Sequence, residues 1–141
     1  MMLVSTYIAP SAIEGVGVFA EDRIPAGTTV WRFDDQFDRV VGVDDLDAMP
    51  EHFRAFFERY AYPLASDPSR LVLEVDNGRF MNHAEAPNTD FSIPFIGTVL
   101  RDIAAGEELT CNYAEFAPEY VLLPSFIASK AKASHNGAAP A

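Results

Sequence analysis

The sequence predicts one mainly β domain that is interrupted by a single helical insertion. Short runs of β-branched and aromatic residues alternate with turn signals made of Gly, Pro, Asn and Asp, a pattern typical of small sheets. One stretch, about residues 36–70, instead carries apolar residues at helical spacing. The chain has 141 residues, a length that suits one domain with its own hydrophobic core.

The expected strands are short and are separated by recognisable turns. In the turn signal at residues 23–27, Pro25 presets φ and Gly27 can adopt a positive φ. Residues 76–78, with the sequence Asp-Asn-Gly, form a second tight-turn signal, after which the strand is expected to continue through residues 79–81. The runs expected to form strands are 3–9, 18–20, 28–33, 71–75, 90–92, 95–101 and 108–112.

The insertion contains the one predicted helix. Pro50 suits a first helical turn, and the aspartates at 44, 45 and 47 can cap the helix start. Tyr62-Pro63 is expected to end the helix, and residues 66–69 are expected to form a loop. An aromatic stripe at helical spacing is more often core than a ligand site. The stripe consists of Met49, Phe53, Phe56, Phe57 and Tyr60.

The composition excludes several classes of protein. The formal net charge of −11 argues against a nucleic-acid partner, because Lys and Arg are needed to neutralise phosphate backbones. The same charge either attracts a basic peptide or only keeps the chain soluble. No apolar run approaches the roughly 18 residues of a membrane span, and the N-terminus lacks the basic segment of a secretory signal.

Cysteine and histidine usage narrows the class further. Cys111 is the single cysteine, which excludes an internal disulfide and a cysteine zinc cluster. His52 and His135 have no paired ligand spacing, so no metal is expected. These features predict a protein of the reducing cytoplasm.

Three short stretches stand out by their residue types and their order. The first is Gly15-Val16-Gly17-Val18-Phe19-Ala20, and the second is Arg79-Phe80-Met81-Asn82-His83. The third follows a turn signal at residues 104–106 and is Glu107-Glu108-Leu109-Thr110-Cys111-Asn112-Tyr113. Together they resemble the three signature motifs of SET domains, the protein-lysine methyltransferases that use S-adenosylmethionine. In size the chain is similar to the small single-domain members of bacterial type.

The resemblance implies a SET-domain (β-clip) fold of several small, mostly antiparallel sheets. It also implies a knot-like C-terminal crossing, in which the Asn-His segment and the final tyrosine segment build the active site. Residues 1–117 would form the SET domain, with the helical insert at about residues 36–70. Residues 118–127 are expected to pack on the domain as a short C-terminal segment, and residues 128–141, rich in Ala, are expected to be a disordered tail.

The resemblance implies a binding site for S-adenosylmethionine. Gly15, Val16 and Gly17 match the glycine motif whose backbone approaches the cofactor, and glycine suits close approach or a positive φ. Asn82 and the backbone around His83 match the residues that hold the cofactor's two ends. Phe116 matches a residue that covers the cofactor in relatives. The alternatives are a plain turn at the glycines and a core histidine at position 83.

Tyr113 is the expected catalytic residue, because it matches the last tyrosine of the third motif. The implied reaction is an in-line displacement in which a lysine amine attacks the methyl group of a sulfonium. Such a reaction depends mainly on alignment, and a tyrosine oxygen with nearby carbonyls can orient the amine. The alternative is an aromatic residue that only closes the domain.

Four residues are expected to line the substrate lysine channel: Phe33, Tyr60, Tyr62 and Cys111. An aromatic channel suits the lysine stem and its cationic head, although packing is an alternative role for each ring. Cys111 stands where relatives carry Phe or Tyr, and its smaller side chain is expected to leave room for di- or trimethylation. Asn112 replaces the usual Asp, which preserves a hydrogen-bond acceptor but removes a charge.

Two functions of different classes therefore follow from the sequence. The first is a methyltransferase that acts on a Lys-rich protein or peptide, with a homodimer as one way to complete the peptide groove. The second is a non-catalytic module of the same fold that binds a peptide or self-associates, which the changes at Phe33 and Asn112 would favour. Methylation of a small molecule or of another side chain is a third alternative.

Overall fold

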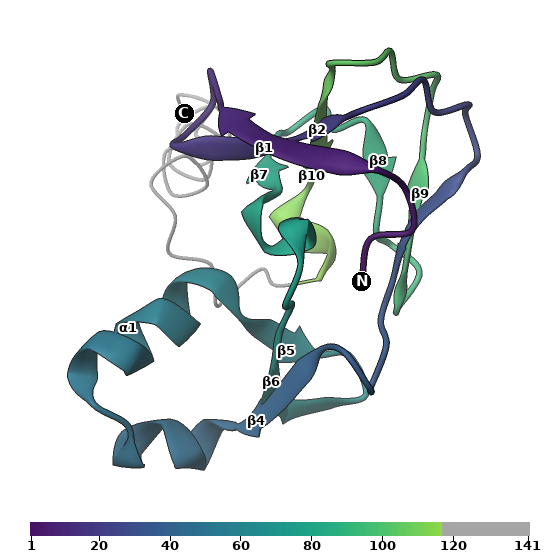
Figure 1. The fold of residues 1–141 in the computed structure, drawn as a ribbon. Coiled ribbons are helices and arrows are strands. Elements are labelled where there is room, and N and C mark those ends of the chain that lie inside the picture. Colours follow the sequence, from purple (N-terminus) through teal and green to yellow (C-terminus); the bar gives the residue numbers. More distant parts are fainter. Residues whose placement is uncertain (117–141) are drawn as a thin grey trace, which may run out of the picture.

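The computed structural model describes residues 1–116, which form three small, mostly antiparallel sheets and one α-helix (Figure 1). The segments expected at 118–127 and 128–141 lie outside the described residues. The strands are β1 (Thr6–Pro10), β2 (Val16–Ala20), β3 (Thr29–Arg32), β4 (Arg39–Gly42), β5 (Tyr62–Leu64), β6 (Asp67–Leu73), β7 (Asn82–His83), β8 (Thr89–Asp90), β9 (Ile96–Val99) and β10 (Glu108–Cys111). The helices are α1 (Glu51–Tyr60) and the 3₁₀ helices η1 (Val43–Ala48), η2 (Asn77–Phe80) and η3 (Tyr113–Glu115). No helix in this described part is long and apolar enough to cross a membrane.

β10 lies inside the first sheet, whose order is β1-β2-β10-β7. It pairs antiparallel with β2, and it pairs parallel with β7, where Cys111 faces His83. The side chain of Asn88 extends this pairing, because its Oδ1 accepts from Thr110 N at 2.8 Å and its Nδ2 donates to Glu108 O at 2.7 Å. β10 therefore holds the strand of the glycine motif on one side and the Asn-His strand on the other.

Two similar turns lie side by side, one before β3 of the second sheet, whose order is β3-β9-β8, and the other before β10. Ile24 N donates to Ile103 O at 2.9 Å, and Ile103 N donates to Ile24 O at 2.9 Å. Each turn contains a glycine with positive φ, which is 79° at Gly27 and 81° at Gly106. Glycine adopts this conformation without steric cost, so the shared sequence pattern produces two equivalent turns.

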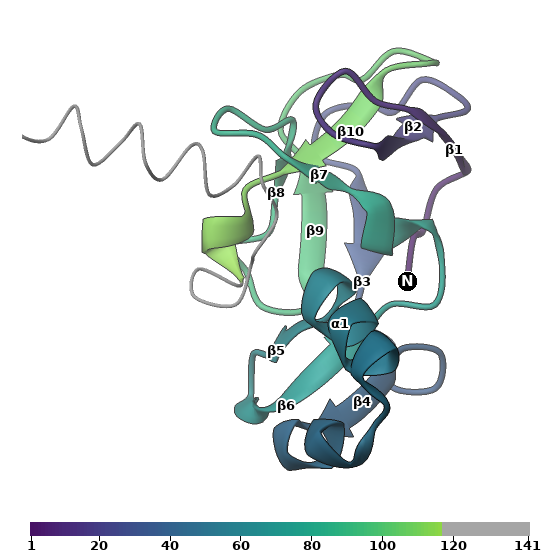
Figure 2. The same ribbon diagram turned by 90° about the vertical axis from the view of Figure 1, so that its left-hand side faces the viewer.

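The insert lobe, residues 39–73, forms the third sheet and carries α1 (Figure 2). Its sheet has the order β4-β6-β5, and its own small core contains Leu46, Phe57, Leu71 and Leu73. The larger core belongs to the first two sheets, where Val18, Val30, Ile103 and Leu109 are fully buried. Residues 1–116 thus contain two apolar cores, one in the insert lobe and one in the first two sheets.

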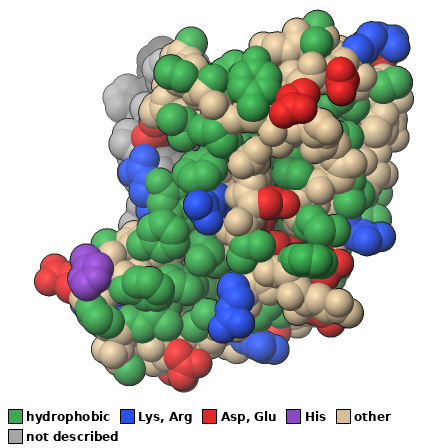
Figure 3. Space-filling model, viewed as in Figure 1, with side chains coloured by type: hydrophobic (Ala, Val, Ile, Leu, Met, Phe, Trp, Pro, Cys, Tyr) green, Lys and Arg blue, Asp and Glu red, His purple; other side chains and the backbone are tan. Residues whose placement is uncertain are grey.

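Only part of the predicted aromatic stripe on α1 is buried. Phe57 is 4% exposed, whereas Phe53 is 46% exposed. Hydrophobic side chains therefore remain at the surface of the insert lobe, in the lower left of Figure 3. The helical spacing predicted α1 correctly, but the small insert core is able to cover only one side of it.

The sequence prediction is wrong at the ends of the insertion. Pro50 is the N-cap of α1, with φ −55° and ψ 145°, and is not part of its first turn. The three aspartates belong to η1, which has no side-chain cap hydrogen bond. Of the expected loop at residues 66–69, only Ser66 lies in a turn, because pairing of Leu64 with Asp67 extends β6 back to Asp67. Pro68 is tolerated there because it lies at the beginning of the strand.

The segment after β6 also differs from the expected continuing strand. Residues 77–80 form η2, and Asp76 caps it by accepting from Gly78 N at 3.0 Å. Asn77 Nδ2 donates to Thr6 O at 3.1 Å and so ties η2 to β1. The Asp-Asn-Gly sequence does interrupt the strand, as predicted. The contact with β1 favours a 3₁₀ helix after it in place of a continuing strand.

We expect Leu109→Ala to lower the free energy of unfolding by about 3 kcal/mol, because Leu109 is fully buried and the substitution leaves a cavity. Urea unfolding of the purified variant measures the loss. Leu100→Ala is the matched control, since Leu100 is 56% exposed and its truncation should cost less than about 0.5 kcal/mol. Equal losses for the two variants would contradict the assignment of the main core.

Candidate active site

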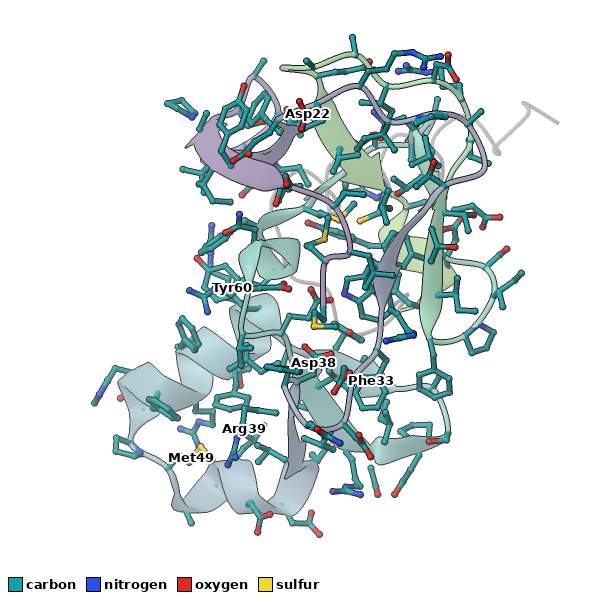
Figure 4. The ribbon with its side chains drawn as sticks, turned by 45° about the vertical axis from the view of Figure 1, so that its right-hand side comes forward. Asp22, Phe33, Asp38, Arg39, Met49 and Tyr60 are labelled. Carbon is teal, nitrogen blue, oxygen red and sulfur yellow. The ribbon has the colours of Figure 1, made fainter. Side chains whose placement is uncertain are left out.

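A cavity of about 420 Å³ lies between the insert lobe and the first two sheets. Six residues that the sequence analysis proposed as site residues line it: Phe33, Tyr60, Tyr62, Cys111, Tyr113 and Phe116. Figure 4 shows that Phe33, after β3, and Tyr60, at the end of α1, belong to different parts of the fold. Folding therefore brings together residues that are far apart in the chain.

Tyr113 is fixed in the cavity wall by two hydrogen bonds. Its hydroxyl donates to Met81 O at 2.6 Å, and its backbone N–H donates to His83 Nδ1 at 3.1 Å. The side chain is 7% exposed, and burial raises the pKa of the phenol well above its ordinary value. Tyr113 is therefore a neutral phenol, whose oxygen has lone pairs that can accept hydrogen bonds.

His83 positions Tyr113 from the neighbouring strand. Its Nδ1 accepts from Tyr113 N, and the two rings lie 5.2 Å apart between centroids. Burial lowers the pKa of His83, while Glu85 acts in the opposite direction. A neutral imidazole with Nδ1 as acceptor is consistent with this contact. The side chain of His83 thus acts on the geometry of the tyrosine.

The glycine motif and Asn82 form a second group of residues beside the cavity, and they do not line it. Asn82 Nδ2 donates to Glu14 O at 3.1 Å, to Val16 O at 2.9 Å and to Glu108 Oε1 at 2.9 Å. Gly15 has a positive φ of 50°. A Cβ atom at Gly17 would lie 2.1 Å from Glu108 Oε1, so a larger residue there would require the Glu108 side chain to move.

Several residues of the cavity wall were not predicted from the sequence, among them Trp31, Phe91 and Phe95. Trp31 and Phe91 have ring centroids 5.4 Å apart, and Phe33 and Phe95 have centroids 5.5 Å apart. Phe95 has a positive φ of 68°, a strained conformation for an aromatic residue. From the sequence, Trp31, Phe91 and Phe95 were expected only in strands, where rings commonly pack in the core. Their convergence on one cavity depends on the sheet arrangement.

The comparisons with known proteins identify the family. The family model of the SET domain matches residues 15–114. The chain belongs to the SET domain family. No curated protein sequence matches the chain.

Solved structures share the SET fold with this chain. A structure of the Chaetomium thermophilum polycomb repressive complex 2 has a TM-score of 0.61 and 24% identity, covering 83% of this chain and 16% of that chain. A humanized mutant of the same complex, bound to the inhibitor GSK126, has a TM-score of 0.58 and 24% identity, covering 80% and 15%. A candidate histone methyltransferase of Plasmodium falciparum has a TM-score of 0.55 and 18% identity, covering 79% and 95%. The predicted fold class is confirmed.

Two departures from the SET motif have a clear structural setting. Asn112 caps η3, and its Oδ1 accepts from Ala114 N at 3.0 Å, a bond that Asp and Asn make equally well. Cys111 is 2% exposed, and burial raises the pKa of its thiol well above the ordinary value. The thiol is therefore protonated and unreactive, as expected for a buried cysteine.

Glu74 is an ionisable residue of the cavity wall that was not predicted from the sequence as a site residue. Its side chain lines the cavity, is buried, and accepts from Tyr62 Oη at 3.1 Å through Oε1. Burial raises the pKa of Glu74 from 4.5 to about 7, with smaller contributions from the carboxylates of Asp76 and Asp38. Among residues 1–116, no group of His, Cys, Asp and Glu is arranged to hold a metal.

We expect Glu74→Gln to stabilise the protein at higher pH. Folding raises the pKa of Glu74, so its favourable contribution is complete below about pH 4.5 and is lost as the pH rises through about 7. Glutamine does not ionise, so the stability of the variant relative to wild type should grow by on the order of 2–3 kcal/mol between about pH 4.5 and 8. Urea unfolding across this range measures the difference. A constant difference would contradict the raised pKa.

Proposed function

We propose that this SET domain is an S-adenosylmethionine-dependent methyltransferase that transfers a methyl group to the side-chain amine of a protein lysine. The observation that carries the proposal is the buried Tyr113 hydroxyl, which is bonded to Met81 O in the wall of an aromatic cavity. Family membership supports the reaction class, because the match to the SET domain includes Tyr113 and its motif. The alignment of an amine with a methyl donor needs a fixed oxygen of this kind.

The chemistry of the second group of residues fits S-adenosylmethionine. The carbonyl oxygens of Glu14 and Val16 and the carboxylate of Glu108 suit an ammonium group, and the amide of Asn82 offers both a donor and an acceptor. When bound, S-adenosylmethionine supplies a methyl group on a positively charged sulfur. Asn82 would hold the glycine segment in the geometry that receives it.

The cavity residues would bind and orient the lysine. The rings of Tyr62, Phe33 and Phe116 suit the apolar stem, and they exclude water that would otherwise solvate the amine. The Tyr113 oxygen and the Met81 carbonyl carry partial negative charge, which favours a nitrogen that becomes positively charged as it attacks. The small Cys111 side chain supports the proposal that di- or trimethylation is not blocked.

The substrate proposed for this site is a Lys-rich protein or peptide. The formal net charge of −11 would attract such a segment and would accelerate its association. The proposal includes a cytoplasmic location, and a second copy of the chain remains one way to complete a peptide groove. The role of Asn112 as a cap removes one reason to favour a non-catalytic module, because the cap does not need a charge.

We expect Tyr113→Phe to reduce kcat for lysine methylation by at least about a hundredfold, as for other single polar groups that act in the transition state. The fold should persist, because loss of the donor to the buried Met81 O costs only about 1–3 kcal/mol. A labelled methyl donor with a Lys-rich peptide measures turnover, and calorimetry measures cofactor affinity. Unchanged turnover in a folded variant would refute the mechanism.

We expect Asn82→Ala to weaken S-adenosylmethionine binding, because it removes the donor that holds the carbonyls of Glu14 and Val16. A loss of about tenfold or more is expected if the glycine segment loosens. Calorimetric titration with S-adenosylmethionine and with S-adenosylhomocysteine measures it, and Tyr113→Phe is the control that should still bind. If the folded wild-type protein binds neither compound, with or without a Lys-rich peptide, the proposed function is wrong.

A further inference from the structure

We propose that Glu74 and Tyr62 form a cation subsite in the cavity wall, which binds the charged ammonium head of the substrate lysine. This inference rests on the proposed function, and it adds a residue that selects the substrate by charge. Both side chains line the same cavity as Tyr113. Tyr62 belongs to β5, and Glu74 directly follows the neighbouring strand β6, so both lie outside the three signature motifs.

One side-chain oxygen of Glu74 lacks a hydrogen-bond partner among the described residues. Oε1 accepts from the Tyr62 hydroxyl at 3.1 Å, but Oε2 is buried and has no hydrogen-bond partner among the described residues. The residue as a whole is only 6% exposed. A buried carboxylate oxygen without a partner is costly, and a ligand that donates a hydrogen bond would remove this cost.

The glycine at position 78 makes room for this oxygen. A Cβ atom built at Gly78 would lie 1.9 Å from Glu74 Oε2, and Gly78 itself lines the cavity. Any larger residue would press against the carboxylate from η2. The absence of a side chain at this position therefore leaves space for the buried Oε2.

The surroundings of Glu74 favour a cation. The amino group of Met1, which contacts Asp38 at 3.3 Å, lowers the pKa of Glu74. The carboxylates of Asp76 and Asp38, on two other segments, raise it. Arg79 also lines the cavity, but its guanidinium stacks over the Phe80 ring at 4.7 Å. The thiol of Cys111 is protonated. Three carboxylates against one amino group and one guanidinium still leave an excess of negative charge, which an arriving ammonium would neutralise.

The aromatic residues next to Glu74 suit the rest of a lysine side chain. Tyr62 contacts the rings of Trp31 and Phe116, with centroids 6.4 Å and 5.3 Å away. The Phe116 ring in turn lies 5.9 Å from the Tyr113 ring. Apolar faces bind a four-carbon stem, and they also attract a cation through their π electrons. A lysine with a pKa of about 10.4 enters as the cation, which is the form that this subsite would select.

A small probe tests the subsite without the cofactor or turnover. The probe is n-butylammonium, added to the purified full chain, and the signal is the fluorescence of Trp31, the single tryptophan, which lines the cavity. We expect binding at about pH 8.5 and at least tenfold weaker binding at about pH 5.5, where Glu74 is protonated. 1-Butanol, which has the same stem without the charge, should bind equally at both pH values.

Three variants separate the subsite from general attraction to an acidic protein. Glu74→Gln should weaken the binding of n-butylammonium at least about tenfold and abolish the pH dependence of that binding. Tyr62→Phe removes a donor that lowers the pKa of Glu74, so the midpoint of the pH dependence should move upward. Glu115→Gln is the control, because Glu115 is an exposed carboxylate of the same cavity, and it should change the affinity less than about twofold.

The outcomes distinguish the subsite from the proposed function. Equal losses in Glu74→Gln and Glu115→Gln, or equal affinities for n-butylammonium and 1-butanol at about pH 8.5, would overturn the subsite. Binding of n-butylammonium that depends on Glu74 supports it even if S-adenosylmethionine does not bind, a result that would refute only the methyltransferase. With an active enzyme, Glu74→Gln should raise KM for the peptide more than it lowers kcat.

Discussion

The parallel pairing of β10 with β7 is the constraint on which the rest of the structure depends. It places Cys111 opposite His83, and it leaves Tyr113 directly after the end of the ladder. From there Tyr113 can give its N–H to His83 and its hydroxyl to Met81 O. Since the other side of β10 pairs with β2, the same strand also fixes the glycine motif. A shift of β10 would therefore displace the proposed cofactor and substrate sites together.

The cavity lies between the two apolar cores of the described residues. The insert lobe packs around Phe57, the larger core packs around Leu109, and aromatic residues line the space between them. The buried Tyr113 hydroxyl has a partner there in Met81 O. Glu74 has one such partner in Tyr62, and its raised pKa expresses the cost of the remaining charge. The chemistry proposed for the site arises at this junction.

Sequence patterns predicted the elements better than their ends. The helical spacing of Phe53, Phe56 and Phe57 identified α1, and the two glycine turns were correct because φ > 0 is a local requirement. The strand expected after Gly78 is instead η2, since bonds from Asn77 to distant β1 override the local signal. From the sequence, Glu74 was predicted only to belong to the strand at residues 71–75. Its significance comes from what surrounds it and from no pattern in the chain.

The sequence alone determined the family, the mainly β class and the residues that the motifs carry, because these depend on residue type, order and local spacing. Only the tertiary structure decided which of those residues share a cavity. Tyr113, Tyr62 and Phe33 line it, whereas Asn82 and the glycine motif lie beside it. The reason is physical: a cavity wall is made by contacts between segments far apart in the chain. Burial, partner atoms and the resulting pKa of a carboxyl group exist only after those segments meet.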